Sequence, residues 1–167
     1  TLPELQRALR RQDYHIFHFI GHGGYDSQGG GVLLFEDEQQ RSRVVTGHQL
    51  GSLLRDEGHL RLAVLNACEG ARASRSDPFA GVGQSLLKQG MPAVIAMQFA
   101  ITDVAASAFA HEFYAALADS YPIDRSLAEA RKAIYAEGID FEWGTPVLFT
   151  RSPDGVLVAL PDAEDAE

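Results

Sequence analysis

Short, mostly apolar segments recur along the chain, each bounded by glycine, proline or polar residues. Their length fits strands better than helices, and a near-continuous apolar run is typical of strands that are buried on both faces. We therefore expect core strands at residues 14–20, 61–66, 93–97 and 146–150, and a short terminal strand at 156–160.

Helices are expected between these strands, where apolar residues recur at three- and four-residue spacing. They cover residues 2–12, 46–56, 78–88, 102–119 and 126–136. In the fourth, the expected apolar side is Val104, Phe109, Phe113 and Leu117. Helix-start signals are the capping-box pairs Thr46 with Gln49 and Ser126 with Glu129, the cap Thr102, and the dipeptide Asp77-Pro78.

The alternation of strands and helices predicts an α/β fold with a mostly parallel central sheet and helices on both faces. Residues 21–31 read as a glycine-rich loop, and residues 32–35 with 43–45 as a surface hairpin. We expect one domain over residues 1–160, followed by an acidic flexible tail at 161–167. Because the chain begins with Thr1 instead of Met, we interpret it as a fragment of a longer protein.

Composition narrows the classes of partner. The formal net charge of -9 disfavours a surface for nucleic acid or anionic membrane. No apolar run approaches the ~20 residues of a membrane span. A lone cysteine cannot form an internal disulfide, which fits a reducing, cytoplasmic location. No phosphate-binding loop is present, and His111-Glu112 lacks the second histidine of a zinc-protease helix, so we expect neither cofactor nor metal.

Two expected strands end at residues that could perform chemistry. Cys68, the lone cysteine, follows the strand at 61–66, and His22 follows the strand at 14–20 between Gly21 and Gly23. A buried cysteine is most often only a small hydrophobe. A nucleophilic cysteine, however, needs a nearby imidazole that favours the thiolate and protonates the leaving amine. Their separation is close to the ~50 residues between His and Cys in caspases, whose cysteine motif resembles residues 66–70.

At these residues the chain resembles the CHAT domain, a bacterial branch of the caspase–separase superfamily (clan CD) of cysteine peptidases. The segments that carry the resemblance, in the family's order, are HFIGHG (18–23), LNACE (65–69), GVGQSLL (81–87), GMPAVIA (90–96), FYAAL (113–117) and WGTPVL (143–148). The resemblance implies a caspase-like sheet with His22 as general acid/base and Cys68 as nucleophile. It also implies an oxyanion hole formed by the backbone N–H groups of Gly23 and Cys68, and a helical-repeat domain in the full-length chain.

Asp103 follows the third core strand, as the acidic specificity residue of separases does. It could line the S1 pocket and bind a basic P1 side chain. It could equally favour the N-terminus of its helix electrostatically. Glu69 and Asp77 are weaker candidates for the pocket, and His18 is interpreted as a packed strand residue.

The resulting hypothesis is a cysteine endopeptidase that cleaves a protein or peptide substrate in a bacterial signalling or defence pathway. The alternative is a catalytically idle interaction or signalling module of the same fold. The presence of both His22 and Cys68 with flanking glycines favours the enzyme, because a scaffold needs neither side chain.

Overall fold

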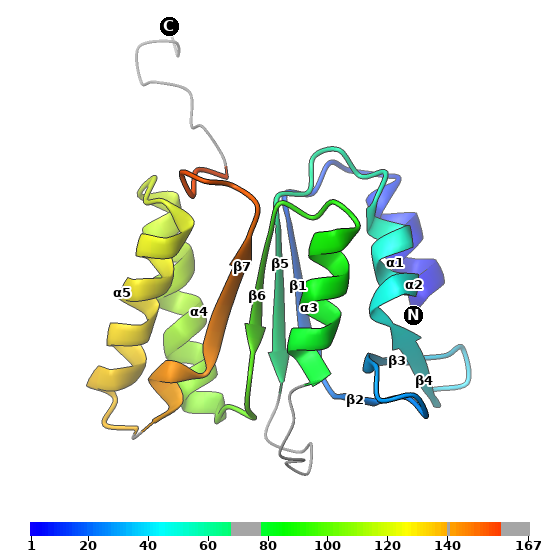
Figure 1. Cartoon of the computed structure of the whole chain (residues 1–167), viewed down its shortest axis with the longest axis horizontal. Coiled ribbons are helices and arrows are strands. Elements are labelled where there is room, and N and C mark those ends of the chain that lie inside the picture. Colours follow the sequence, from blue (N-terminus) through cyan, green and yellow to red (C-terminus); the bar gives the residue numbers. More distant parts are fainter. Residues whose placement is uncertain (68–77, 140, 158–167) are drawn as a thin grey trace, which may run out of the picture.

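The computed structural model describes residues 1–67, 78–139 and 141–157. Its central sheet contains β1 (Ile16–Gly21), β5 (Leu62–Ala67), β6 (Ala93–Met97) and β7 (Pro146–Thr150), in that spatial order (Figure 1). The first three strands are mutually parallel, and β7 runs antiparallel to β6. The mostly parallel sheet predicted from the strand–helix alternation is therefore confirmed.

Helices cover both faces of this sheet (Figure 1). On one face lie α4 (Asp103–Ala118) and α5 (Ile123–Ala136), and on the other lies α3 (Pro78–Lys88), with α2 (Gly47–Leu54) packed beside it. Helix α1 (Leu2–Leu9) precedes the first strand. Phe109 and Phe113 of α4 are fully buried and stack with ring centroids 5.3 Å apart. Val104, which we expected on the buried side of this helix, is 58% exposed, so that assignment was wrong.

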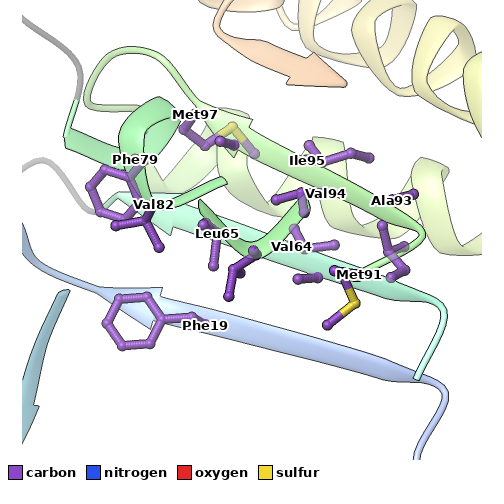
Figure 2. Close-up of a cluster of buried hydrophobic side chains, with 14 of the residues drawn as sticks. Phe19, Val64, Leu65, Phe79, Val82, Met91, Ala93, Val94, Ile95 and Met97 are labelled. Atoms are coloured by element: carbon purple, nitrogen blue, oxygen red, sulfur yellow. The ribbon is translucent and has the colours of Figure 1, made fainter. Parts of the chain in front are cut away.

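The core is centred on β5 and β6 and on the helix that covers them. All five residues of β6 are buried, as expected for a strand covered on both faces. Figure 2 shows Phe79 and Val82 of α3 beside Leu65 and Met97 of the sheet. This packing fixes the start of α3 close to the carboxyl ends of the strands.

A second, antiparallel sheet contains β2 (Gly23–Tyr25), β3 (Gly31–Glu36) and β4 (Ser42–Thr46). The predicted hairpin corresponds to β3 and β4, but two expectations about this region were wrong. Residues 23–25 form a strand within the expected loop, because their backbone pairs with β3. The hairpin also has a buried side, since Val32, Leu33 and Val45 are at most 2% exposed.

Helix starts illustrate where local signals succeed and fail. The Thr46 hydroxyl accepts from Gln49 N, and Gln49 Oε1 accepts from Thr46 N, so this predicted capping box is confirmed. Helix α5 instead begins at Ile123, three residues before the expected start. Pro122 has a fixed φ of -55° and caps the helix, and its carbonyl accepts from Ser126 N, so Ser126 is already inside the helix.

The last described residues do not form the expected terminal strand. Val156 N donates to Asp154 Oδ1, and Gly155 O accepts from Ile123 N, so this segment packs against the start of α5 instead of joining a sheet. Residues 158–160 of that predicted strand and the predicted tail at 161–167 lie outside the described residues. A short 3₁₀ helix, η1 (Glu142–Gly144), precedes β7.

Candidate active site

The two predicted catalytic positions follow paired strand ends. Gly21, the last residue of β1, is paired with Ala67, the last residue of β5. His22 is the next residue after Gly21, and Cys68 is the next residue after Ala67 in the sequence. Cys68 itself lies outside the described residues, as do Glu69 and Asp77. In parallel sheets this carboxyl edge is where ligands bind.

The backbone of His22 is held between the two sheets. Gly21 before it closes the central sheet, and Gly23 after it opens the small sheet. The carbonyl oxygen of His22 accepts a hydrogen bond from Leu34 N at 2.9 Å. Its side chain is exposed. The fold therefore fixes the main chain of His22 and presents its imidazole to solvent.

Gly23 lies against the start of α3 with no room for a side chain. A Cβ at this position would be 2.6 Å from the ring of Phe79, which is 2% exposed. Glycines on both sides of His22 would allow a substrate to approach the backbone closely. The described contact adds another reason for glycine at this position, which is close packing of an aromatic ring from α3.

The direction of the Gly23 N–H follows from which residue pairs of β2 and β3 are hydrogen-bonded. Leu34 N donates to His22 O, and Asp26 N donates to Gly30 O. Residues in an antiparallel ladder alternate between hydrogen-bonded and non-hydrogen-bonded pairs, so Gly23 and Leu33 form a non-hydrogen-bonded pair. The N–H of Gly23 therefore points away from β3.

Asp103 is the first residue of α4 and is exposed. It lines a cavity of about 250 Å³ between α4 and the carboxyl ends of β1 and β5. The other lining residues are His18, Ile20, Asn66, Ile101, Ala106, Ser107 and Ala110. Ile20 and Asn66 each precede a predicted catalytic residue by two positions. Both interpretations of Asp103 remain open, because the residue belongs to the first helical turn and also lines this cavity.

Buried polar atoms adjoin this cavity. Asn66 is 3% exposed, and its Oδ1 has no hydrogen-bond partner among the described residues. His18 is half-buried; its Nδ1 is 2.8 Å from the Tyr114 hydroxyl, and its Nε2 is also unpartnered in the described structure. Burial lowers the pKa of His18 and raises the pKa of Tyr114 to about 12. The packing of His18 against Tyr114 fits its prediction as a packed strand residue.

The start of α4 is tied to η1 by one carboxylate. Glu142 Oε2 accepts from the backbone N of Thr102 at 2.8 Å and from its hydroxyl at 3.0 Å. The Thr102 Oγ1 also accepts from Ala105 N, so Thr102 caps α4, as predicted. Sequence reasoning missed Glu142, because 40 residues separate it from its partner and no local motif joins them.

Sequence reasoning also missed Asn66, although a polar residue at the end of an otherwise apolar run was a usable signal.

Among the described residues, no group of three or more His, Cys, Asp or Glu side chains could hold a metal ion. None of the described helices combines the length and the apolar character that a membrane crossing requires.

The comparison with protein families gives one result that covers most of the chain. The CHAT domain matches residues 1–150. A search of curated proteins finds no match. CHAT domains belong to the caspase-like superfamily of cysteine peptidases. The mixed, mostly parallel sheet and the five α-helices that the described residues form are consistent with that fold. The chain belongs to the CHAT domain family.

Proposed function

We propose that the chain is a cysteine endopeptidase in which His22 and Cys68 form a catalytic dyad. The observation that carries the proposal is the pairing of Gly21 with Ala67, the residues that directly precede His22 and Cys68. The match of the CHAT domain to residues 1–150 supports the same assignment, because resemblance to that family implies His22 and Cys68 as the peptidase dyad.

The proposed reaction has two steps. The Cys68 thiolate attacks the peptide carbonyl carbon, a C–S bond forms, and the imidazolium of His22 gives its proton to the leaving amine as the C–N bond breaks. Water then attacks the thioester while His22 accepts a proton, which releases the carboxylic acid and regenerates the cysteine. The N–H groups of Gly23 and Cys68 would stabilise the oxyanion. The direction of the Gly23 N–H, away from β3, supports this role.

The biological setting that we propose rests on the family resemblance. The substrate is a protein or peptide in a bacterial signalling or defence pathway, and the site of action is the cytoplasm. A helical-repeat domain in the same full-length chain would be its partner. No nucleic acid and no membrane take part.

Peptide-library cleavage by the wild type and by Cys68→Ala, His22→Ala and the double variant tests the dyad. We expect each single substitution to abolish cleavage without unfolding the domain, because His22 is exposed and follows a strand end. The double variant should be no worse than either single one, since residues of one catalytic unit are not additive. His48→Ala is the matched control, because His48 is exposed on α2.

Chemical labelling of Cys68 tests the activated thiol independently of peptide cleavage. An activated thiol should react with iodoacetamide under native conditions, and more slowly in His22→Ala. Full cleavage by Cys68→Ala would reject the mechanism. Absence of cleavage by the wild type, together with a thiol that reacts only after denaturation, would favour the idle interaction module.

A further inference from the structure

Two adjoining cavities lie at the amino ends of the parallel strands, on the opposite edge of the central sheet from the predicted dyad (Figure 1). Ala93, the first residue of β6, is paired with Leu62 at the start of β5 and with Thr150 at the end of β7. Arg61 directly precedes Leu62, and Arg151 directly follows Thr150. The register of the sheet therefore brings these two arginines to one edge.

The first cavity, of about 290 Å³, lies between the starts of β1 and β5 and the C-terminal end of α4. Two of its polar side chains are already in use, because the Tyr114 hydroxyl lies 2.8 Å from His18 Nδ1 and the Arg125 guanidinium covers the Tyr121 ring at 3.9 Å. A peptide backbone bound here would leave N–H and C=O groups unpaired, whereas an alkyl chain would not. The apolar side chains of its lining are Ile16, Leu62, Leu117, Ala118, Pro122 and Leu157.

The second cavity, of about 360 Å³, shares Arg61, Val156 and Leu157 with the first and is also lined by Arg151. Among the described residues, neither arginine forms an ion pair, and neither cavity has an Asp or Glu side chain in its lining. The chain as a whole carries a net charge of -9, so a lining with two cations and no acid is unlike the rest of the molecule. This charge favours an anionic ligand group.

Both arginines keep donors for such a group. Only Nη1 of Arg61 donates to described partners, the carbonyl oxygens of Gly58 and Leu60, and the guanidinium has five N–H donors in total. Arg151 is exposed, and its side chain has one long contact of 3.5 Å, from Nη1 to the carbonyl oxygen of Leu87. The guanidinium fork matches the two oxygens of a carboxylate.

We infer that the two cavities together form a binding site for a free medium-chain fatty acid. The alkyl chain occupies the apolar cavity, and Arg61 and Arg151 bind the carboxylate in the second cavity. The site lies at the opposite ends of β1 and β5 from His22 and Cys68. The inference therefore goes beyond the proposed peptidase function and does not depend on it.

The surroundings disfavour other amphipathic ligands. A cationic amphiphile would place its charge against the two arginines. A nearby carboxylate, that of Asp154, accepts from the Ser152 hydroxyl and from Val156 N through Oδ1, so it is occupied within its own turn. The net charge of -9 also disfavours attachment to an anionic membrane, which leaves a single free fatty acid as the occupant.

Titration of octanoate into the wild-type chain, followed by calorimetry, tests the inference. Each methylene that leaves water should raise affinity about fourfold, so hexanoate should bind about fifteenfold more weakly than octanoate. The alcohol 1-octanol keeps the chain and lacks the charge. It should bind about tenfold or more weakly than octanoate, the effect of one hydrogen bond to a charged group.

A pair of arginine variants tests the carboxylate contact. Arg151→Gln should weaken octanoate binding by about tenfold or more and leave the affinity for 1-octanol unchanged. Arg43→Gln is the matched control, because Arg43 is an exposed arginine on β4 of the small sheet. It should change neither affinity.

A pair of alanine variants on α4 tests the apolar cavity. Ala118 and Ala115 are both exposed, and Ala118 lines the cavity whereas Ala115 does not. Ala118→Phe should weaken both octanoate and 1-octanol by about tenfold or more, because the added ring takes the space of several buried methylenes. Ala115→Phe should weaken neither, and melting temperatures close to the wild-type value would show that both variants are folded.

Three results would overturn the inference: no binding of octanoate to the wild type, equal affinities for octanoate and 1-octanol, or equal effects of the two phenylalanine variants. A dimer in sedimentation that Ala118→Phe disrupts, without octanoate binding, would also overturn it and assign the cavity to an interface between copies of the chain. Cys68→Ala should bind octanoate as the wild type does. The binding result is thus separate from success or failure of the proposed dyad.

Discussion

Gly23 combines a proposed catalytic role with a packing requirement. A Cβ at Gly23 would lie 2.6 Å from the Phe79 ring, whereas a Cβ at Gly24 would lie 3.9 Å from Val32. Both glycines belong to β2, so the pair isolates the effect of the aromatic contact. We expect Gly23→Ala to lower the free energy of unfolding by about 1–3 kcal/mol, because a well-packed core resists added volume.

Gly24→Ala should change that free energy by less than about 0.5 kcal/mol, as surface substitutions usually do. Urea unfolding followed by circular dichroism measures both variants. Equal destabilisation by the two substitutions would show that the Phe79 contact is not the reason for glycine at position 23.

His18 should make stability depend on pH. Burial lowers its pKa from the ordinary value of 6.5, so the unfolded chain binds the proton first as the pH falls. The free energy of unfolding therefore decreases below pH 6.5, until His18 also becomes protonated in the folded state. Tyr114 contacts the ring, and Asp103 lines the same cavity. Tyr114, with a pKa raised to about 12, does not titrate in this range.

His18→Asn is the informative variant, because an amide at this position can still bond to the Tyr114 hydroxyl but does not titrate. We expect the substitution to cost less stability at pH 5 than at pH 7.5. Urea unfolding of both proteins at the two pH values gives the comparison. The same cost at both values would contradict a lowered pKa for His18.

At the residue scale, the sequence offers candidates for the reactive side chains but says less about the groups that surround them. His22 and Cys68 could be named because the chemistry of a cysteine nucleophile requires an imidazole, and each follows an expected strand. Glu142 could not be named, and for Asn66 the sequence shows only a polar residue at the end of an apolar run. The unpartnered state of Asn66 depends on which atoms surround it in the fold, and Glu142 meets Thr102 only after the chain has folded.

Among the elements, α4 has its first turn at the proposed pocket, and its position there depends on Glu142. This carboxylate accepts from both the N–H and the hydroxyl of Thr102, the cap of the helix. We expect Glu142→Ala to lower the free energy of unfolding by about 1.5–3 kcal/mol, because hydrogen bonds to a charged group are lost from a part-buried site. Chemical denaturation measures the loss.

Glu137→Ala is the control for this substitution. Glu137 is an exposed carboxylate at the C-terminal end of α5, where a negative charge is electrostatically unfavourable. Its replacement should leave stability unchanged or raise it slightly. A comparable loss in both variants would indicate that Glu142 contributes only through general charge, not through Thr102.

The two interpretations of Asp103 can be separated by comparing both ends of the same helix. Asp103→Asn should reduce the Arg-to-citrulline ratio of kcat/KM by at least about tenfold if the carboxylate faces the guanidinium. The helix-terminus interpretation predicts a loss of about 0.5 kcal/mol in stability, with substrate preference untouched. For this variant, peptide cleavage measures the Arg-to-citrulline ratio and urea unfolding measures the stability.

Asp119→Asn makes the same change of charge at the C-terminal end of α4. It should leave the Arg-to-citrulline ratio unchanged, and it should slightly raise stability because it removes an acid from the negative end of the helix. If both variants reduced the ratio equally, the net charge of the molecule, not a pocket at Asp103, would explain the preference.

The elements that the sequence predicted well are those with strong local signals. Strand β6 was predicted with its observed bounds, because its apolar run is sharply bounded, and α2 was predicted through its capping box. Strand β2 was missed since three residues that include two glycines carry no strand pattern, and only pairing with β3 orders them. The start of α5 was misplaced because Pro122 competes with Ser126 as the cap.

At the scale of the whole molecule, the small sheet begins at the carboxyl edge of the central sheet. Strand β2 begins directly after His22, and the carboxyl ends of β1, β5 and β6 lie at the same edge as the start of α4 (Figure 1). The alternation of strands and helices predicted the layers of this fold. The register of β1 and β5 was beyond sequence reasoning, because it depends on how the two strands pack between α3 and α4.

The net charge of the whole molecule predicts how salt affects cleavage. The net charge of -9 should attract a basic substrate over distances comparable to the Debye length, which is about 10 Å at 0.1 M salt. If the Asp103 cavity binds a basic side chain, kcat/KM for an Arg peptide should fall several-fold between about 0.02 M and 0.5 M sodium chloride. The matched citrulline peptide should change much less, because it has lost the charge on which screening acts.

Measuring both peptides over one salt series removes any general effect of salt on the enzyme. The dependence for the Arg peptide should also weaken in Asp103→Asn, since the nearest opposite charge is gone, and should persist in Asp119→Asn. Parallel salt curves for Arg and citrulline in the wild type would contradict electrostatic selection. In that case the cavity would be selecting its substrate by shape and hydrogen bonding.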